Sequence, residues 1–337
     1  MWGINMNKQR NIVLIADRIE NHNSISIEST TLELVEDTYF VCLYNSLKEI
    51  NPNVIHYENP QIFLKNINKH KNDVVLSVWS GEKTRNRKAL IPSICEAYNI
   101  PYVGADSYLQ IISADKYLSK KVCTKFNIKS SNDILITQKK DCWMLDRLKY
   151  PVVVKPNLEG GSIGIFKENL AENFESAKKV CEKLLEFYCP IIVEEYLIGE
   201  EVSVCIAGIN NIIDVFQVIQ HKLGQQKFFT KEIFSAEIKK MHKTTRTLEL
   251  ANDILPKTEK EKLINLFNNL GKAEVMRIDG RIYNNNFYLI ELTPDCSLKI
   301  KGSMSLAFEQ SGYTYTDMLR KLIANSIHSW VNQNAKR

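Results

Sequence analysis

The sequence lacks the short motifs that identify the commonest nucleotide-binding proteins. No GxxxxGK[ST] string occurs in it, which excludes a P-loop, and no GxGxxG follows its first predicted strand, so we expect no dinucleotide site there. Internal repeats and low-complexity linkers are also absent. At 337 residues the chain is too long for one simple core, and we expect two or three domains.

The spacings typical of metal sites and disulfide frameworks are missing as well. The eight cysteines are scattered without a CxxC pair, and the six histidines show no ligand spacing. Because several of the cysteines lie in apolar runs, buried free thiols in a reducing compartment explain them better than disulfides or zinc.

Long hydrophobic runs and a strong net charge are absent too. No apolar run reaches membrane-spanning length, and residues 1–10 lack the apolar core of a signal peptide. The net charge of +5 permits anionic small-molecule ligands but is not the charge pattern of a nucleic-acid-binding protein. We expect a cytoplasmic enzyme or binding protein whose partners are neither membranes nor nucleic acids.

What is present centres on residues 150–165, YPVVVKPNLEGGSIGI. The β-branched run 152–154 predicts a buried strand ending on Lys155, and a glycine-rich loop follows before a return strand at 163–166. Glycines let backbone N–H groups approach an anion closely, and a lysine beside them adds a charge suited to phosphate. A β-hairpin with a glycine-rich turn and a solvated lysine is the alternative.

Three regions surround this stretch. Residues 1–106 alternate strands with helices and predict a parallel α/β domain, 107–190 predict a small α+β subdomain, and 191–337 predict a domain of antiparallel strands. Strands are expected at 11–17, 53–57, 73–79, 134–137, 190–199, 201–207, 212–219, 273–278 and 287–292. Helices are expected at 32–50, 60–69, 88–98, 107–126, 172–188, 257–271 and 315–330. The basic, irregular segment 221–246 favours a functional loop.

Two predicted strands of the third region bring charged side chains together. A turn at 279–286 between these strands places Arg277, Asp279 and Glu291 near one another. Carboxylates that face each other across two strands are unfavourable unless a cation or an arginine joins them, so they indicate a metal site. A surface network of one arginine and two carboxylates is the alternative.

The order of these parts resembles the ATP-grasp fold, and most closely the D-alanine–D-alanine ligase family, from about Asn99 to Ala324. The motifs that carry the resemblance are SADK (113–116), VVVKP (152–156), the glycine loop, VEEYLIGEE (193–201), AEIKK (236–240), MRID (276–279) and Glu291. The resemblance implies an N-terminal parallel-sheet (pre-ATP-grasp) domain, a central α+β subdomain and a C-terminal antiparallel-sheet domain with the metal site.

The resemblance also implies roles for individual residues. The nucleotide-binding set is Lys116, Lys155, Glu159, Gly160, Gly161, Ser162, Glu194, Glu195, Leu197 and Glu201. In this set the lysines and the glycine loop contact phosphate, Glu194 and the backbone at Glu195 and Leu197 contact adenine, and Glu201 contacts ribose. The catalytic set is Arg277, Lys239 and Ser162, and the ligands of Mg²⁺ or Mn²⁺ are Asp279, Glu291 and Thr293.

The implied reaction joins a small carboxylate to a small amine. ATP would phosphorylate the carboxylate to an acyl phosphate, and the amine would then attack it to give an amide, ADP and phosphate. Phosphoryl transfer depends mostly on positioning and charge neutralisation, for which lysines, magnesium and a glycine loop are suitable. The resemblance further implies a homodimer formed through the N-terminal domain.

The sequence departs from the family mostly where substrate binds. A His-Gly…Gly-Glu-Asp-Gly loop in the family is replaced here by residues 78–85, VWSGEKTR. The first of two loop serines in the family becomes Gly161 here. The tyrosine that follows the family's counterpart of Lys239 becomes Lys240. Glu20 is expected to hold the ammonium of the first substrate. The pocket for a first D-alanine is therefore rebuilt, and we expect a larger, or a more polar or acidic, first substrate.

Two further departures concern the metal and the second substrate. The family's Glu-x-Asn becomes Glu291-Leu-Thr293, and a hydroxyl is a poorer magnesium ligand than an amide oxygen. Ser303 is expected to meet the carboxylate of the second substrate, with help from Lys299 or Lys301. We therefore expect an ATP-dependent carboxylate–amine ligase. The alternatives are a D-alanine–D-alanine ligase with a drifted site and a non-catalytic ATP-binding regulator.

Overall fold

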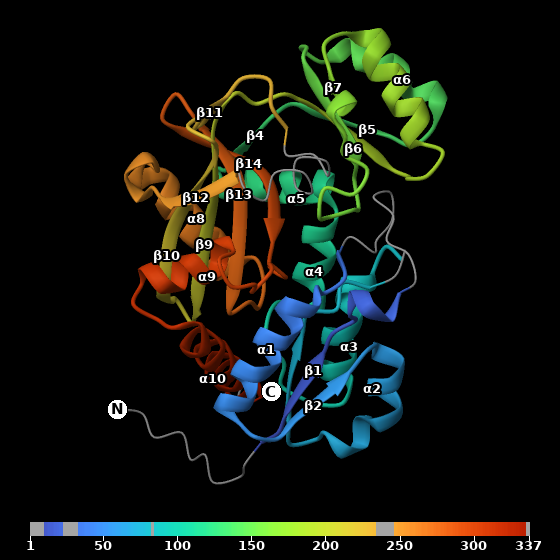
Figure 1. The fold of residues 1–337 in the computed structure, drawn as a ribbon. Coiled ribbons are helices and arrows are strands. Elements are labelled where there is room, and N and C mark those ends of the chain that lie inside the picture. The colour runs from blue at the N-terminus through green and yellow to red at the C-terminus, as the bar shows by residue number, and fades with distance from the viewer. Residues whose placement is uncertain (1–9, 23–32, 82–83, 234–245, 335–337) are drawn as a thin grey trace.

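The computed structural model describes residues 10–22, 33–81, 84–233 and 246–334. Its strands form sheets of three, seven and four strands. In Figure 1 the three-stranded sheet lies at the base of the molecule, the seven-stranded sheet above it, and the four-stranded sheet at the upper right. None of the helices in these ranges contains a stretch long and apolar enough to cross a membrane.

The N-terminal unit is a parallel α/β layer, as the sequence predicts. Strands β1 (Ile12–Ile15), β2 (Val54–Tyr57) and β3 (Val74–Ser77) pair in the order β2-β1-β3. The helices of the unit are α1 (Asp37–Ile50), α2 (Pro60–Asn66) and α3 (Leu90–Ala97). Helix α1 begins later than the predicted residue 32, because Val35 is extended and its N–H donates to the carbonyl of Asp17 at 3.0 Å.

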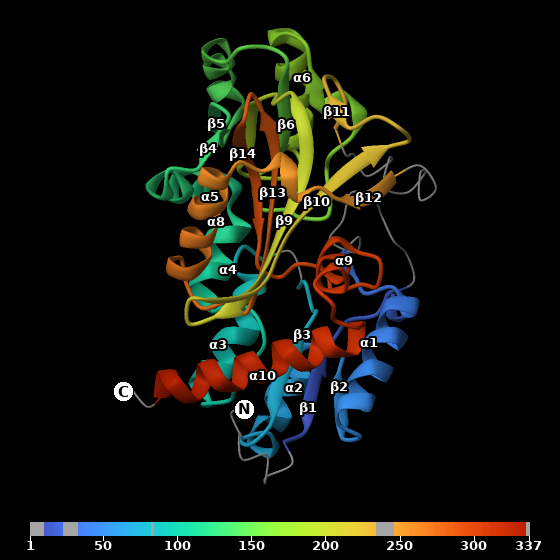
Figure 2. The same cartoon turned by 90° about the vertical axis from the view of Figure 1, so that its left-hand side faces the viewer.

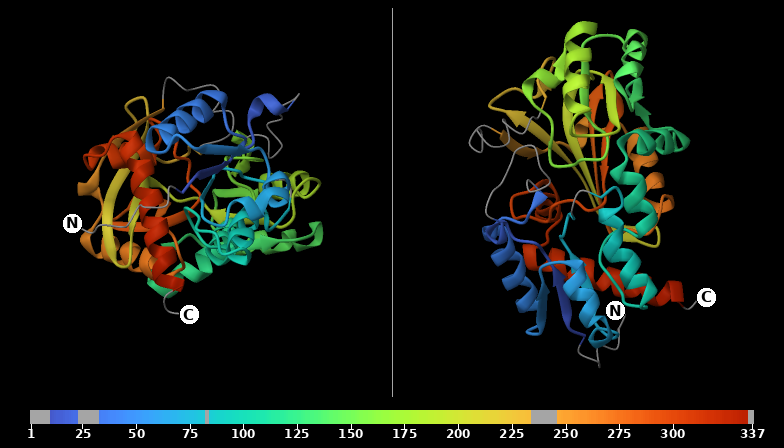
Figure 3. Two further views of the ribbon diagram at one scale, coloured as in Figure 1. Left: turned by 90° about the horizontal axis from the view of Figure 1, so that it is seen from below. Right: turned by 90° about the vertical axis from the view of Figure 1, so that its right-hand side faces the viewer.

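The last two helices of the chain return to this unit. Helices α9 (Ser303–Gln310) and α10 (Tyr315–Asn334) contribute Phe308 and Leu322 to one hydrophobic cluster with Leu14 of β1 and Leu43 of α1. Figures 2 and 3 show α10 lying across the N-terminal unit beside α1. The two ends of the chain therefore share one core.

The predicted helix at 107–126 is two helices. Helix α4 (Ser107–Ala114) ends before Asp115, and helix α5 (Lys116–Cys123) begins after it. The prediction of one helix is wrong because Asp115 is extended, and its side chain accepts a hydrogen bond from the N–H of Leu118 at 3.0 Å. Such a side chain caps a new helix rather than continuing an old one. The break makes Lys116 the first residue of α5.

The central subdomain is a four-stranded sheet covered by one helix. Strands β5 (Asp133–Ile136), β6 (Val152–Pro156), β7 (Leu170–Ala171) and β8 (Ile191–Glu195) pair in the order β5-β8-β6-β7, and α6 (Phe174–Leu184) packs on β6 and β7. The predicted return strand at 163–166 is a turn and irregular chain instead. The amide of Asn169 donates to the carbonyls of Val154 and Gly164 and holds this turn, so pairing with β6 starts only at Leu170.

The seven-stranded sheet supplies one wall of the cavity described below. Its order is β12-β10-β9-β13-β14-β4, with β11 paired to β9. The strands are β4 (Lys129–Ser130), β9 (Gly199–Ile209), β10 (Ile212–Leu223), β11 (Phe228–Phe229), β12 (Arg246–Leu250), β13 (Val275–Tyr283) and β14 (Asn286–Thr293), and α8 (Lys257–Asn269) packs against it. Part of the segment expected to be a loop, 221–246, therefore belongs to β10, β11 and β12.

The turn between β13 and β14 is shorter than the predicted 279–286. It consists of Asn284 and Asn285, which both have positive φ, a backbone conformation that asparagine tolerates well. Both strands consequently run past the carboxylates of Asp279 and Glu291, which lie inside the ladder. Short 3₁₀ helices complete the fold at Ile19–Asn21, Ile67–Lys69, Arg87–Ala89, Thr124–Phe126, Lys139–Arg147, Lys167–Asn169 and Asn252–Ile254.

Candidate active site

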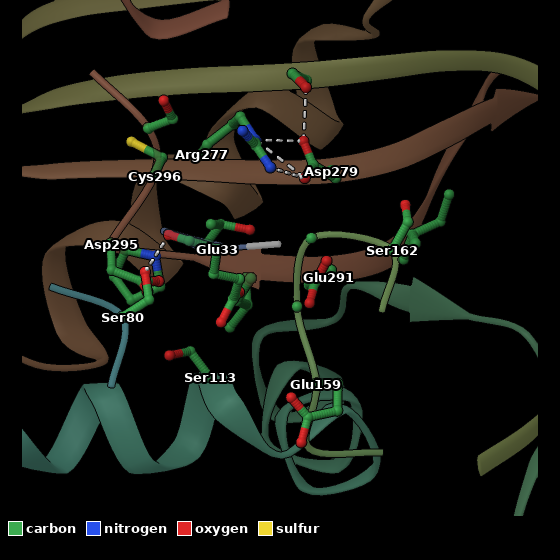
Figure 4. Close-up of a pocket in the computed structure, with 18 of the residues that line it drawn as sticks. Glu33, Ser80, Ser113, Glu159, Ser162, Arg277, Asp279, Glu291, Asp295 and Cys296 are labelled. Atoms are coloured by element: carbon green, nitrogen blue, oxygen red, sulfur yellow. Dashed lines mark hydrogen bonds and ion pairs between the residues drawn. The ribbon is translucent and has the colours of Figure 1, made fainter. Parts of the chain in front are cut away.

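A cavity of about 540 Å³ lies where the three units meet. Its walls come from the N-terminal unit, the glycine loop of the central subdomain, and strands β9, β13 and β14 of the large sheet. Figure 4 shows Arg277, Asp279 and Glu291 on strands of the large sheet, Glu159 and Ser162 on the glycine loop, and Glu33, Ser80 and Asp295 grouped at one side. Most of the residues predicted for the site line this one cavity.

Two buried lysines share one buried carboxylate in the cavity wall. The Nζ atoms of Lys155, on β6, and Lys120, on α5, contact the two carboxylate oxygens of Glu194, on β8. Burial alone would raise the pKa of Glu194, but the two lysines lower it to about 2. Glu194 is therefore ionised in the fold and holds Lys155 at the cavity.

Lys120 is absent from the residues that the sequence motifs predict. A signal for it exists, because Lys116 and Lys120 are four residues apart on α5 and so lie on the same face of the helix. The two lysines are both buried. From the sequence, a lysine outside a motif is normally interpreted as solvent-exposed. The helical spacing alone therefore does not identify Lys120 as a site residue.

Lys116 connects the glycine loop to the predicted metal ligands. Its Nζ donates to the backbone carbonyl of Glu159 and lies 3.2 Å from a carboxylate oxygen of Glu291. Burial favours the neutral form of Glu291, but Lys116, Lys155 and Lys88 together outweigh it, and the pKa of Glu291 is lower than its ordinary value. The phosphate lysine and the metal carboxylate of the prediction thus meet in the same cavity.

The glycine loop lies against the N-terminal unit. The guanidinium of Arg87, a buried residue, donates to the carboxylate of Glu159 at 2.9 Å and to that of Glu33 at 3.4 Å. Gly161 has φ of +61°, and a Cβ at this position would lie 3.2 Å from Cγ of Glu33. Glycine therefore permits both the backbone conformation and the close approach to Glu33.

The predicted metal ligands lie on two paired strands. Asp279 on β13 faces Glu291 on β14, and Arg277 faces Thr293. The guanidinium of Arg277 donates to both oxygens of Asp279 at 2.7 to 3.0 Å, and the hydroxyl of Ser203 donates to Asp279 at 2.6 Å. Within the described ranges, Thr293 Oγ1 is buried without a hydrogen-bond partner. An unsatisfied hydroxyl two residues from Glu291 on the same strand is available as an additional ligand for a magnesium ion.

The protein alone offers few ligands for such an ion. No group of three or more His, Cys, Asp or Glu side chains in the described part of the chain could hold a metal. Magnesium is commonly bound by one or two carboxylates together with substrate phosphates and water. The pair Asp279 and Glu291 fits that mode, in which the nucleotide completes the coordination.

The residues predicted to contact the adenine base and the ribose lie at one end of the cavity, which we call the base-and-ribose end. Glu195, Leu197 and Glu201 all line the cavity. The carboxylate of Glu195 accepts hydrogen bonds from the N–H of Lys149 at 3.0 Å and from Asn132 at 2.9 Å. Burial raises the pKa of Glu201, although Arg281 opposes this shift. Arg281, which pairs with Glu201 at 3.0 Å, is not among the predicted site residues.

The opposite end of the cavity is built by the N-terminal unit and the segment after β14. Lys88 Nζ lies 2.7 Å from the carboxylate of Asp295 and 3.7 Å from that of Glu33. Burial alone would lower the pKa of Lys88, but these carboxylates raise it above its ordinary value, so Lys88 is charged. Trp79 and Ser80 line the same end.

Two predicted substrate residues are not brought to the cavity. Glu20 is exposed, pairs with Arg18 and is not among the lining residues, whereas Glu33 lies in the wall against the glycine loop. Ser303 is buried in the first turn of α9 and is not among the lining residues; of the two lysines predicted to help it, Lys299 lines the cavity and Lys301 does not. The predicted lid lysines, Lys239 and Lys240, lie outside the described residues.

Comparisons with known proteins agree on one family. The sequence profile of the family described as D-ala D-ala ligase C-terminus matches residues 123–324. A D-alanine–D-alanine ligase of Pelagibacter ubique is 26% identical over 298 residues, covering 84% of this chain and 87% of that protein. One of Wigglesworthia glossinidia brevipalpis is 25% identical, covering 95% of this chain and 90% of that protein.

Solved structures of ligases have the same fold. A D-alanine–D-alanine ligase from Bacillus anthracis complexed with ATP superposes with a TM-score of 0.70 at 18% identity, covering 96% of this chain and 99% of that chain. The VanG D-Ala:D-Ser ligase from Enterococcus faecalis gives a TM-score of 0.68 at 16% identity, covering 96% of this chain and 100% of that chain. These likenesses confirm the predicted ATP-grasp fold, with a parallel sheet and antiparallel sheets.

Proposed function

The chain belongs to the D-ala D-ala ligase C-terminus family, and from that membership we propose how its cavity joins a carboxylate to an amine. It is an ATP-dependent, ADP-forming ligase that makes a carbon–nitrogen bond. The observation that carries the site assignment is the position of Lys116, which contacts both the glycine loop and Glu291. Phosphate-binding and metal-binding groups must converge in this way for phosphoryl transfer.

We assign the nucleotide to the half of the cavity formed by β6, β8, β9 and the glycine loop. Lys116 and Lys155 neutralise phosphate charge, and Glu194 orients Lys155 while its carboxylate faces the adenine amino group. Glu201 accepts hydrogen bonds from the ribose hydroxyls. The backbone of the glycine loop, including Ser162, covers the phosphates, because its glycines allow N–H groups to approach them closely.

Asp279, Glu291 and Thr293 would hold Mg²⁺ or Mn²⁺. Such an ion, when bound, neutralises charge on the transferring phosphoryl group. Arg277 lies beside Asp279, which fixes its guanidinium by three hydrogen-bonding contacts. A fixed cation at this position stabilises the oxyanion that forms when the amine attacks the acyl phosphate. Lys239 is proposed to contact the γ-phosphate on the strength of its motif alone.

The first substrate, we propose, is not D-alanine. Glu33, in place of the predicted Glu20, is positioned to bind a substrate ammonium, while Gly161 removes the side-chain donor that a serine at this position would supply. Lys88 adds a buried cation at the same end, 2.7 Å from Asp295. A substrate larger than alanine, or one with an additional acidic or polar group, would use that cation. The second predicted cation, Lys240, supports the same inference from the sequence.

A turnover screen tests both whether the protein is a ligase and whether its first substrate differs from D-alanine. The protein is incubated with ATP, Mg²⁺ and pairs of D- and L-amino acids, dicarboxylic amino acids or hydroxy acids, and ADP and product mass are measured. ADP release that depends on one pair supports a ligase. D-Alanine giving the highest kcat/KM would show that the site has only drifted. Tight ATP binding without turnover on every pair would favour the non-catalytic regulator.

A further inference from the structure

Arg281 lies at the base-and-ribose end of the cavity, on the strand that carries Asp279. It is on β13, and its register partner across the ladder on β9 is Glu201. Its side chain is only 4% exposed, and it lines the cavity. None of the sequence motifs assigns it a role, and a buried arginine at this place needs a physical reason.

The guanidinium is fixed by contacts on all sides. Its Nε and Nη2 donate to the same oxygen of Glu201, Oε2, at 3.1 and 3.0 Å. Its Nη1 donates to the backbone carbonyl of Leu197, and Nη2 also donates to the carbonyl of Glu232 at 3.0 Å. The ring of Tyr196 lies 4.7 Å from the guanidinium carbon and that of Phe229 5.5 Å from it. Arginine is suited to such a place because its planar group donates in several directions and stacks on rings.

These contacts orient two groups that we assign to nucleotide binding, the carboxylate of Glu201 and the backbone at Leu197. Both bonds to Glu201 fall on Oε2, so Oε1 keeps its capacity to accept from another donor. The bond to Leu197 holds the backbone that faces the purine edge. Among the groups acting on Glu201, Arg281 is the first that opposes the effect of burial and favours the ionised carboxylate. An ionised carboxylate accepts hydrogen bonds from a diol more strongly than a neutral acid does.

We propose that Arg281 is a positioning residue for the ribose: it holds the Glu201 carboxylate oriented as the acceptor for the ribose hydroxyls. This inference rests on the proposed nucleotide site. It adds a residue that acts through Glu201 rather than by contact with the reacting atoms. It also gives a reason for the buried charge, since an arginine that served only the core could be replaced by an apolar side chain of similar size.

The test compares two nucleotides that differ only at the ribose. Dissociation constants for ATP and for 2′,3′-dideoxy-ATP are measured by calorimetry on the full chain with Mg²⁺. Wild-type protein is expected to bind ATP tighter by roughly tenfold or more, because a hydrogen bond to a charged group is worth about 1.5–3 kcal/mol. In Arg281→Met the ratio of the two constants should fall to about threefold or less, as it should in the reference variant Glu201→Gln. Arg281→Lys, which keeps the charge without the planar fork, should give an intermediate ratio.

The ratio separates positioning from a structural role. If Arg281 only stabilises the sheet, Arg281→Met weakens both nucleotides equally, and an unchanged ratio overturns the inference. Should that variant not fold, the ratio in Arg281→Lys decides in the same way. Arg320→Met, which removes an exposed arginine on α10, is the matched control and should keep the wild-type ratio. If wild-type protein binds neither nucleotide, the proposed function itself is wrong and this inference falls with it.

Discussion

The two ends of the cavity are built differently. At the nucleotide end, most of the charged side chains stand on paired strands, where the register fixes their neighbours: Asp279 faces Glu291, and Arg281 faces Glu201. At the opposite end, where we place the first substrate and which we call the acyl end, Glu33, Arg87 and Lys88 come from connecting segments and a short 3₁₀ helix of the N-terminal unit. Their partners, Glu159 and Asp295, belong to other units.

Because of this difference, substitutions at the two ends of the cavity should have different effects. At the nucleotide end the register of the strands defines the neighbours of each charged side chain, so one substitution there removes a defined set of contacts. The acyl end depends on ion pairs between units, so its substitutions alter both substrate contacts and the closeness of the units. Substrate choice can therefore change by replacing connecting segments, while the nucleotide chemistry stays the same.

The largest effect should come from the metal carboxylates. Asp279→Asn is expected to lower turnover by on the order of a thousandfold, because a bound metal supplies several kcal/mol of charge stabilisation. Nucleotide affinity should fall much less, since the lysines remain. Stopped ADP release with retained ATP binding confirms this, and Asp253→Asn, at an exposed position, is the control. Wild-type turnover in Asp279→Asn would show that the paired strands hold no functional metal.

Acid should weaken the nucleotide end through Glu194. Its pKa in the fold, about 2, is below the ordinary value of 4.5, so its stabilising contribution is present above pH 4.5 and is lost as the pH falls toward 2. The contribution is up to roughly 3 kcal/mol. The denaturant midpoint of the wild type should fall more steeply between pH 5 and pH 3 than that of Glu194→Gln. Equal slopes for the two proteins would contradict the ion-pair assignment, and Glu186→Gln, at an exposed site, should follow the wild type.

Removal of one phosphate lysine should weaken ATP binding. Lys155→Ala and Lys116→Ala each delete one charge-assisted contact, and we expect a loss of about 1.5–3 kcal/mol in binding free energy. Titration with ATP measures it. Lys183→Ala, at an exposed site in the same subdomain, should bind ATP as the wild type does. Unchanged affinity in both cavity variants would remove the basis of the nucleotide assignment.

The smallest effect should be confined to the acyl end. Glu33→Gln is expected to raise the KM of the first substrate about tenfold, since one charged contact with its ammonium is weakened. Its dissociation constant for ATP should stay within about twofold of the wild type. Glu20→Gln is the matched control, because Glu20 lies on the surface and should change neither value. A large change in ATP affinity in Glu33→Gln would mean that the two ends are not separable.

The same contrast explains what could be predicted from the sequence. Lys116, Lys155, Glu194, Asp279 and Glu291 were predicted because they stand in motifs that resemble those of the D-alanine–D-alanine ligase family, and all five line one cavity. The parallel sheet was predicted from the alternation of strands and helices. Lys120 was not predicted, because it lies one helical turn after the SADK motif (113–116) and belongs to no motif itself.

The acyl end could not be predicted in this way. Glu33 is separated from β1 by a segment without periodicity, and nothing local distinguishes it from Glu20. Arg87 and Lys88 belong to the site because of ion pairs with residues far along the chain, Glu159 and Asp295. The break at Asp115 was missed because a single aspartate inside an apolar helical pattern reads as a surface residue until its side chain is seen to cap α5.

The position of α10 has a consequence for how the chain is made. A ribosome releases β1, α1 and β3 first, but their apolar faces pack against α9 and α10, which emerge long afterwards. Domains of many proteins fold from the N-terminus while synthesis continues. Here one apolar face of the N-terminal unit, including Leu14, Leu43 and Leu76, lacks its partners on α9 and α10 until those helices are made. The final helix thus closes the first core, and partly synthesised chains should be the form most prone to aggregation.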